Sequence, residues 1–362
     1  MNNRSLLPDN VAFETLSIHA GSPRFGEGDR NNDVRMFEER MMALEGAEEG
    51  CATSSGRAAV FAICMAYLKA DDHIVCSRTV SDATHTLFSE TLAQFGISCT
   101  FVDLSDSEQW LDAMHNNTGM LYLETPSNPL CEVADLEALA EIAQCGDALL
   151  VVDNSFCTPA LLQPLAWGAD IVIHSTTGFL DGQGRCTGGI ALGSKKKIEP
   201  VQLWRYVTGA SLSPFEAWML LKGLETLKLR MDAHCRNAQQ LAWWLAEHPK
   251  VVDVHYCSLP NHPGAALARK QQQGYGAILS FEVEGSSEAA LKVIEGVQII
   301  SRSTNVGDTH TTMIHPATTT HSRLSDEERE NTGIVDGLIR IAAGLENVED
   351  LKRDLERGLG LL

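Results

Sequence analysis

Residues 148–189 read ALLVVDNSFCTPALLQPLAWGADIVIHSTTGFLDGQGRCTGG, and they decide the fold. The stretch contains two short, wholly apolar runs, 149–152 and 171–173, and each run ends in polar residues. Such runs are typical of parallel strands buried on both faces of a sheet. The helix-length segment between them predicts a strand, a crossover and a second strand. Ligands of such sheets bind beyond the carboxyl ends of the strands, where this chain carries Asp153 and His174-Ser175-Thr176-Thr177.

The composition is typical of a globular chain with two domains, because 44% of the 362 residues are apolar and 21% are charged. We expect a shortened N-terminal arm over residues 1–30, a first domain over 31–220, and a smaller α+β domain over 221–362. No apolar run is long enough to cross a membrane, and the first ten residues lack the apolar core of a signal peptide. A cytoplasmic location and no membrane association are therefore predicted.

Charge and cysteine usage exclude other classes of function. The net charge of −20 and the absence of a basic stripe argue against nucleic-acid binding, since phosphate neutralisation supplies most of that affinity. The ten cysteines are scattered without a Cys-x-x-Cys pair, so we expect reduced thiols in or near the core. His310, His315 and His321 lack the spacing and carboxylate partners of a metal site, and no metal is predicted.

Three further segments carry candidate binding residues. Ala52-Thr53-Ser54-Ser55-Gly56-Arg57-Ala58-Ala59 is a turn of small residues that opens a helix, either a phosphate seat or an ordinary capped turn. The phrase 124–129, Glu-Thr-Pro-Ser-Asn-Pro, follows an apolar strand and is either a site segment or a turn punctuated by prolines. Arg340 lies between apolar neighbours, which is unusual for an arginine without a partner.

The words VVDNSF (151–156), GADIVIHSTTGF (168–179) and DGQGRCTGG (181–189) resemble the cofactor segment of a known family. The chain is identified as a member of the cysteine/methionine-metabolism (transsulfuration) family of pyridoxal-phosphate (PLP) enzymes. DGQGRC points to the O-succinylhomoserine sulfhydrylase branch. The resemblance implies an α/β chain of the fold type I PLP-transferase class. Such a chain has a mostly parallel central sheet with helices on both faces and a smaller C-terminal α+β domain.

The resemblance also implies roles for individual residues, which we carry over by position. The phosphate would be bound by Ser55, Gly56, Arg57, Ser175 and Thr177, and Asp153 would hold the pyridine nitrogen. Asn128 would lie beside the 3′ oxygen of the cofactor and near the substrate. Asn305 and Arg340 would bind the substrate, with the arginine on its α-carboxylate.

Three positions depart from the family pattern. Gly178 occupies the place of the lysine that forms the Schiff base, so no catalytic residue is assigned. Ser81 occupies the place of an aromatic ring that stacks on the cofactor; we expect His85 to be an ordinary helix residue rather than its substitute. The Tyr-x-Arg element that reaches the partner subunit's phosphate is missing between Arg24 and Val34, and Arg57 would replace part of its charge.

Two functions follow from this pattern. The first is a transsulfuration-type enzyme acting on a homoserine ester or a sulfur amino acid, with PLP held non-covalently or as a preformed amino-acid adduct. The second is a lysine-less pseudoenzyme that serves as a binding or scaffold partner of another protein. A laboratory replacement of the lysine would not account for Ser81 and the missing Tyr-x-Arg element. In both cases the retained cofactor-domain segments imply a homodimer or homotetramer.

Overall fold

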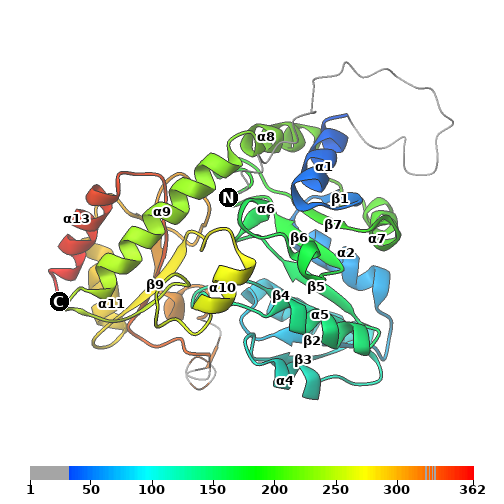
Figure 1. Cartoon of the computed structure of the whole chain (residues 1–362), viewed down its shortest axis with the longest axis horizontal. Coiled ribbons are helices and arrows are strands. Elements are labelled where there is room, and N and C mark those ends of the chain that lie inside the picture. The colour runs from blue at the N-terminus through cyan, green and yellow to red at the C-terminus, as the bar shows by residue number, and fades with distance from the viewer. Residues whose placement is uncertain (1–31, 323, 326, 328, 330–331) are drawn as a thin grey trace.

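The computed structural model describes residues 32–322, 324–325, 327, 329 and 332–362, and it has two lobes (Figure 1). The larger lobe is built on a seven-stranded sheet with the order β1-β7-β6-β5-β4-β2-β3. β7 is antiparallel to both of its neighbours, and the other pairings are parallel. In chain order the strands are β1 (Glu49–Thr53), β2 (His73–Ser77), β3 (Ser98–Val102), β4 (Thr118–Glu124), β5 (Leu149–Asp153), β6 (Ile171–Ser175) and β7 (Gly189–Gly193).

Helices cover both faces of this sheet because its central strands are apolar at successive positions. Leu150 and Val152 of β5 pack against one helical layer, whereas Val151 between them packs against the other. The first layer contains α1 (Asn32–Glu45), α5 (Leu136–Cys145), α6 (Thr158–Leu161) and α8 (Pro214–Leu224); the second contains α2 (Gly56–Tyr67) and α7 (Lys195–Thr208). Shorter helical segments are α3 (Asp82–Thr86), a π-helical turn at Leu87–Thr91, α4 (Ser107–Asp112), and 3₁₀ turns at Leu92–Phe95 and Pro164–Trp167.

The smaller lobe is a five-stranded sheet with the order β10-β11-β12-β9-β8. Its hydrophobic core lies between one face of the sheet and the helices α9, α11 and α13. The long helix α9 extends from beside the larger lobe to the smaller sheet (Figure 1). The elements are α9 (Leu227–Ala246), β8 (Val251–His255), α10 (Ala265–Gln271), β9 (Ile278–Val283), α11 (Ser287–Gly296), β10 (Ser301–Arg302), β11 (Thr312–Ile314), a 3₁₀ turn (Pro316–Thr318), β12 (Leu338–Ala342) and α13 (Val348–Leu359).

The predicted fold class is confirmed by this architecture. β5 and β6 are buried, parallel neighbours, as the two apolar runs predict. The crossover between them differs from one long helix, because Pro159 lies in the first turn of α6, which ends at Leu161, and Pro164 begins a separate 3₁₀ turn. The boundary at 220/221 falls inside α8 and stays a prediction. The arm over residues 1–30 lies outside the described residues.

Two smaller expectations concern location and cysteines. No described helix is long and apolar enough to cross a membrane. The predicted cytoplasmic location stays a prediction. All ten cysteines are free, and most are buried, but Cys145 at the end of α5 is exposed.

Candidate functional site

Asp153 lies at the carboxyl end of β5, where its carboxylate is tied to the neighbouring strand. It accepts hydrogen bonds from the Ser155 N–H at 2.9 Å and from the Ser155 hydroxyl. The backbone N–H of Ser175, at the end of β6, donates to the same Ser155 oxygen at 2.7 Å. Ser155 therefore connects two predicted cofactor residues and fixes the direction of the Asp153 carboxylate. Sequence reasoning did not assign Ser155 a role.

Glu124 is a second carboxylate at the same edge and is buried, and sequence reasoning missed it as a site residue. It ends β4 directly opposite Asp153 in the parallel register. Burial, and then the charge of Asp153, raise the pKa of Glu124 to about 8. Burial also raises the pKa of Asp153. Among the described lysines and arginines, none forms an ion pair with either carboxylate. A protonated pyridine nitrogen would supply the missing positive charge.

This raised pKa makes the stability of the cofactor-free protein depend on pH. The folded chain keeps the Glu124 proton up to about pH 8, whereas the unfolded chain releases it near its ordinary value of 4.5. The contribution of Glu124 to the free energy of unfolding should therefore be fully present below about pH 4.5 and be lost as the pH rises to about 8, by at most about 1.4 kcal/mol per pH unit. Glu124→Gln should flatten this slope in urea titrations. The exposed control Glu108→Gln should not, and an unchanged slope in Glu124→Gln would contradict the assignment.

The predicted phosphate seat is assembled where α2 begins. The Ser55 hydroxyl caps the helix by accepting from the Ala58 N–H at 3.1 Å, which leaves the N–H groups of Gly56 and Arg57 without a capping partner of this kind. A Cβ on Gly56 would lie 3.0 Å from the Cβ of Ser175, so glycine lets the turn approach the end of β6. The backbone thus brings Ser55, Gly56 and Ser175 together, while the Arg57 and Thr177 side chains are exposed at its margin.

Arg340 is the buried cation of the smaller lobe. Its side chain is fully buried on β12, and burial lowers its pKa to about 10. Its guanidinium donates to the backbone carbonyls of Thr304 at 3.1 Å and Asn305 at 3.5 Å. Its Nε has no hydrogen-bond partner among the described residues, and none of their carboxylates forms an ion pair with it. A buried guanidinium with spare donors is a site for a carboxylate ligand.

Asn128 and Asn305 are connected to Arg340 through backbone groups, either directly or by way of neighbouring residues. The half-buried Asn128 precedes Pro129, whose carbonyl accepts from the Ser280 hydroxyl at 2.7 Å. Ser280 is directly opposite Arg340 in the β9–β12 register. Asn305 contributes its carbonyl to Arg340, while its side chain is exposed. The predicted substrate residues therefore gather around Arg340, although their side-chain roles stay predictions.

Gly178 lies three residues beyond the end of β6 and is half-buried. A Cβ on it would lie 3.0 Å from the carbonyl oxygen of Val306, in the loop whose carbonyls bind Arg340. Neighbouring segments do not offer an amine at this edge of the sheet. β7 is antiparallel to β6, so Lys195–Lys197 follow it at the opposite edge, and Lys69 follows α2 there too. The other lysines are engaged with partners of their own. Five pair with acidic side chains, namely Lys222, Lys228, Lys270, Lys292 and Lys352, and Lys250 donates to the Leu359 carbonyl.

Ser81 lies at the edge of the site, and it has no aromatic ring that could stack on a cofactor. Its N–H donates to Glu124 at 2.9 Å at the start of α3. His85, on the same helix, is stacked on Phe101 with ring centroids 4.3 Å apart. That contact agrees with the expectation that His85 is an ordinary helix residue. The missing Tyr-x-Arg element lies outside the described residues.

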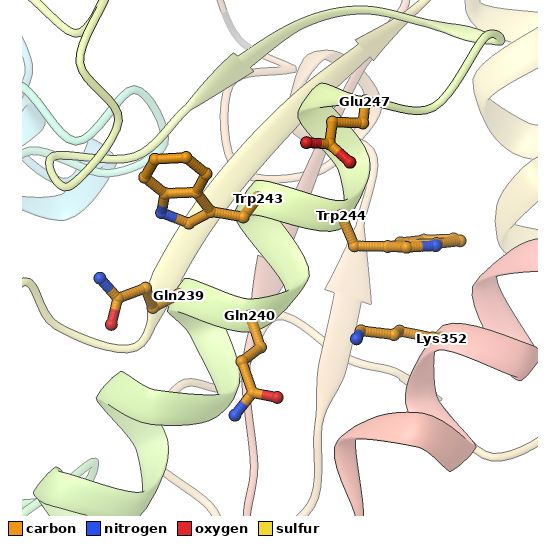
Figure 2. Close-up of a pocket in the computed structure, with 6 residues that line it drawn as sticks. All are labelled: Gln239, Gln240, Trp243, Trp244, Glu247 and Lys352. Atoms are coloured by element: carbon orange, nitrogen blue, oxygen red, sulfur yellow. The ribbon is translucent and has the colours of Figure 1, made fainter.

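A hollow outside this site lies in the smaller lobe. It has a volume of about 420 Å³ and is open to the surface between α9 and α13 (Figure 2). Its lining residues are Gln239, Gln240, Trp243, Trp244, Glu247 and Lys352, none of which belongs to the site. The histidines of the 310–321 segment are engaged locally, since His315 bonds to Thr318 and the Asp336 carbonyl, and His310 to Asp308.

The strand-end carboxylates, the glycine turn at α2 and the buried Arg340 together match a fold type I α/β protein that binds PLP at the carboxyl edge of its sheet. The chain belongs to the family described as Cys/Met metabolism PLP-dependent enzyme, whose family model matches residues 28–360.

Relatives support this membership over nearly the whole chain. O-succinylhomoserine sulfhydrylase of Pseudomonas aeruginosa is 45% identical over 389 residues, which cover 98% of this chain and 96% of the relative. L-methionine gamma-lyase of Fusobacterium nucleatum is 42% identical over 91% of this chain and 84% of the relative. The solved structure of cystathionine gamma synthase from Xanthomonas oryzae, in complex with aminoacrylate and cysteine, has a TM-score of 0.89 and 35% identity, covering 91% and 86% of the two chains.

Proposed function

We propose that this transsulfuration-type protein acts on homoserine esters or sulfur amino acids, and that it holds PLP without a covalent bond. The proposal rests on one observation: the site around Gly178 keeps carboxyl groups on one side and a buried arginine on the other. Asp153 is half-buried and Glu124 is buried at the strand ends, and Arg340 is buried with spare donors. Buried charges are costly without a partner, so their retention favours a ligand that joins them.

Each end of the site would hold a different part of the ligand. Asp153, oriented by Ser155, would bind the pyridine nitrogen, and the N-terminus of α2 with Ser175 would bind the phosphate. Arg340 would bind the α-carboxylate of the substrate. When bound, PLP supplies the electron sink that stabilises negative charge at the substrate Cα.

Gly178 limits the chemistry that the chain can perform on a bound cofactor and substrate. It has no side chain to hold the cofactor or to move a proton at Cα, and proton transfer by a positioned side chain contributes typically 10²- to 10⁴-fold. We therefore infer a turnover lower than that of a lysine-containing relative by a factor of this order. The alternative function is favoured by the same glycine: a lysine-less pseudoenzyme that serves as a binding or scaffold partner of another protein, without turnover.

The test of cofactor binding is titration calorimetry of the full chain with PLP, with its amine form and with a phosphopyridoxyl amino acid. We expect reversible binding of all three, with no lysine labelled after borohydride reduction. Arg57→Met should weaken each affinity by roughly tenfold to a hundredfold, because one charge-assisted contact to phosphate contributes about 1.5 to 3 kcal/mol. An absence of binding for every ligand would leave only the scaffold function, and a labelled lysine would contradict the non-covalent mode.

We also propose a homodimer or a dimer of dimers. Large apolar side chains are exposed on α7, α8 and the first turn of α9, among them Val207 at 68%, Phe215 at 69% and Leu229 at 73%. Exposed apolar surface of this kind is typical of protein interfaces. Sedimentation velocity at micromolar concentration should show an oligomer, and a monomer there would contradict the proposal.

A further inference from the structure

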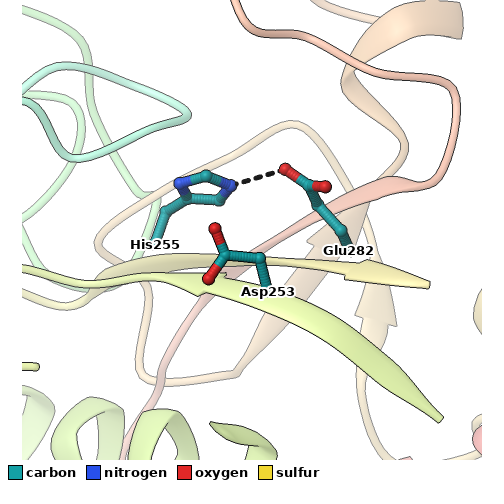
Figure 3. A group of neighbouring side chains, drawn as sticks. All are labelled: Asp253, His255 and Glu282. Carbon is teal, nitrogen blue, oxygen red and sulfur yellow. Dashed lines mark hydrogen bonds and ion pairs between the residues drawn. The ribbon is translucent and has the colours of Figure 1, made fainter. Parts of the chain in front are cut away.

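We propose that Asp253, His255 and Glu282 form a site for a divalent transition metal of the zinc class, in the smaller lobe and distinct from the proposed PLP site. One ligand atom from each of these side chains lies within 4.8 Å of the other two. The three side chains converge on one side of the β8–β9 ribbon (Figure 3). The proposal is independent of the proposed function.

The site is produced by strand register. In the antiparallel pairing of β8 with β9, Asp253 is directly opposite Glu282, and His255 is opposite Ser280. Residues 253 and 255 share one face of β8 because side chains alternate along a strand, while Val254 and Phe281 pack into the core on the other face. A shift of register between Val251 and Asp253 sets this alignment. No regular spacing in the sequence indicates the cluster, because its third member comes from another strand.

The donor set fits a zinc-class ion. One imidazole nitrogen and two carboxylate oxygens are ligands that Zn²⁺ uses, and three protein ligands leave a fourth position for water. His255 Nε2 already lies 2.7 Å from Glu282 Oε1, so a small side-chain movement would bring both atoms to one ion. His255 and Glu282 are about one-fifth exposed, at 21% and 19%, and Asp253 is exposed, which gives an ion access from solvent.

Electrostatics favours a cation here. Like charges directly opposite each other across a strand pair are destabilising, and Asp253 and Glu282 form such a pair. A divalent ion would neutralise both. His262 also faces this region, but its Nδ1 accepts from the Gly264 N–H at 3.1 Å, so we do not include it among the ligands.

The position suggests what the ion would do. β8 is an edge strand that pairs only with β9. A metal held by both strands would fix this edge. β9 also pairs with β12, where Ser280 lies opposite Arg340. The ion would therefore stabilise the sheet that carries Arg340 without touching the PLP site. The proposal departs from the sequence prediction of no metal, which weighed only His310, His315 and His321 and not this cluster.

The test is calorimetric titration of metal-free full-length protein with Zn²⁺, together with thermal melting. We expect one tight site whose affinity falls at least tenfold in His255→Gln and in Glu282→Gln, and a melting temperature that Zn²⁺ raises only in the wild type. His248→Gln is the matched control. His248 pairs with Glu356 at 3.2 Å and is not part of the metal cluster, so its replacement should leave Zn²⁺ binding unchanged. Asp253→Asn, at an exposed position, tests the site if a variant of the half-buried His255 or Glu282 fails to fold.

The absorption spectrum of bound Co²⁺ distinguishes binding at this site from binding by cysteine thiols. A Co²⁺ complex without the strong ultraviolet band of thiolate ligation, lost in His255→Gln, would support the assignment. Thiolate absorption, or a Zn²⁺ affinity that is the same in wild type, Asp253→Asn and Glu282→Gln, would overturn it. Absence of Zn²⁺ binding to the wild type at micromolar concentration would overturn it as well.

Discussion

Gly178→Lys is expected to hold PLP covalently, with a yellow colour that survives gel filtration and a phosphopyridoxyl group on the introduced lysine after borohydride reduction. The position follows β6 at the same edge as Asp153, and the glycine is not in the left-handed region of φ. An added Cβ meets the Val306 carbonyl at 3.0 Å, which a shift of a few tenths of an ångström relieves. Turnover of a homoserine ester should rise by roughly 10²- to 10⁴-fold, since the lysine restores proton transfer at Cα.

Gly178→Met is the matched control for this prediction. Methionine has a similar reach and meets the same Val306 carbonyl, but it has no amine. It should change the melting temperature about as much as lysine does, without covalent attachment and without a gain in turnover. A folded Gly178→Lys protein that binds PLP but is not labelled by borohydride would show that position 178 does not face the cofactor.

The sequence predicted the fold well where burial leaves few alternatives. The runs 149–152 and 171–173 correspond to β5 and β6, each extended by polar residues that reach the site. A parallel strand buried on both faces must be apolar throughout, so its sequence is distinctive. The crossover between the two strands was less predictable, because a segment with two prolines can be any short helical connection. The antiparallel direction of β7 was not predicted, since direction depends on long-range pairing.

Within the site, the sequence located residues at strand ends but not the relations between strands. Asp153 and Ser175 were found because each follows an apolar run. Glu124 also follows such a run, and that was the available signal. Its raised pKa arises first from burial and then from the charge of Asp153, which the strand register places beside it. Ser155 acquires its role only from hydrogen bonds to two strands. No spacing of residues in the sequence reveals such interactions between residues of different strands.

Arg340 is the residue whose replacement should have the largest effect on substrate binding. Its side chain has two candidate roles, which the structure keeps distinct. It donates to the carbonyls of Thr304 and Asn305 and so anchors the loop over Gly178. It also keeps Nε and part of its guanidinium available, without a described carboxylate beside it. A purely structural arginine would not need the additional donors.

Arg340→Met should abolish the preference for ligands that carry an α-carboxylate. A phosphopyridoxyl amino acid should bind the wild type more tightly than PLP does, and the variant should lose this difference, by about 3 kcal/mol or roughly a hundredfold. Arg340→Lys should recover only part of it, because an ammonium lacks the planar pair of donors that a guanidinium presents to a carboxylate. The affinity for PLP itself should remain nearly constant in both variants. Equal losses for PLP and for the adduct, with a lowered melting temperature, would instead assign Arg340 to anchoring the loop at Val306.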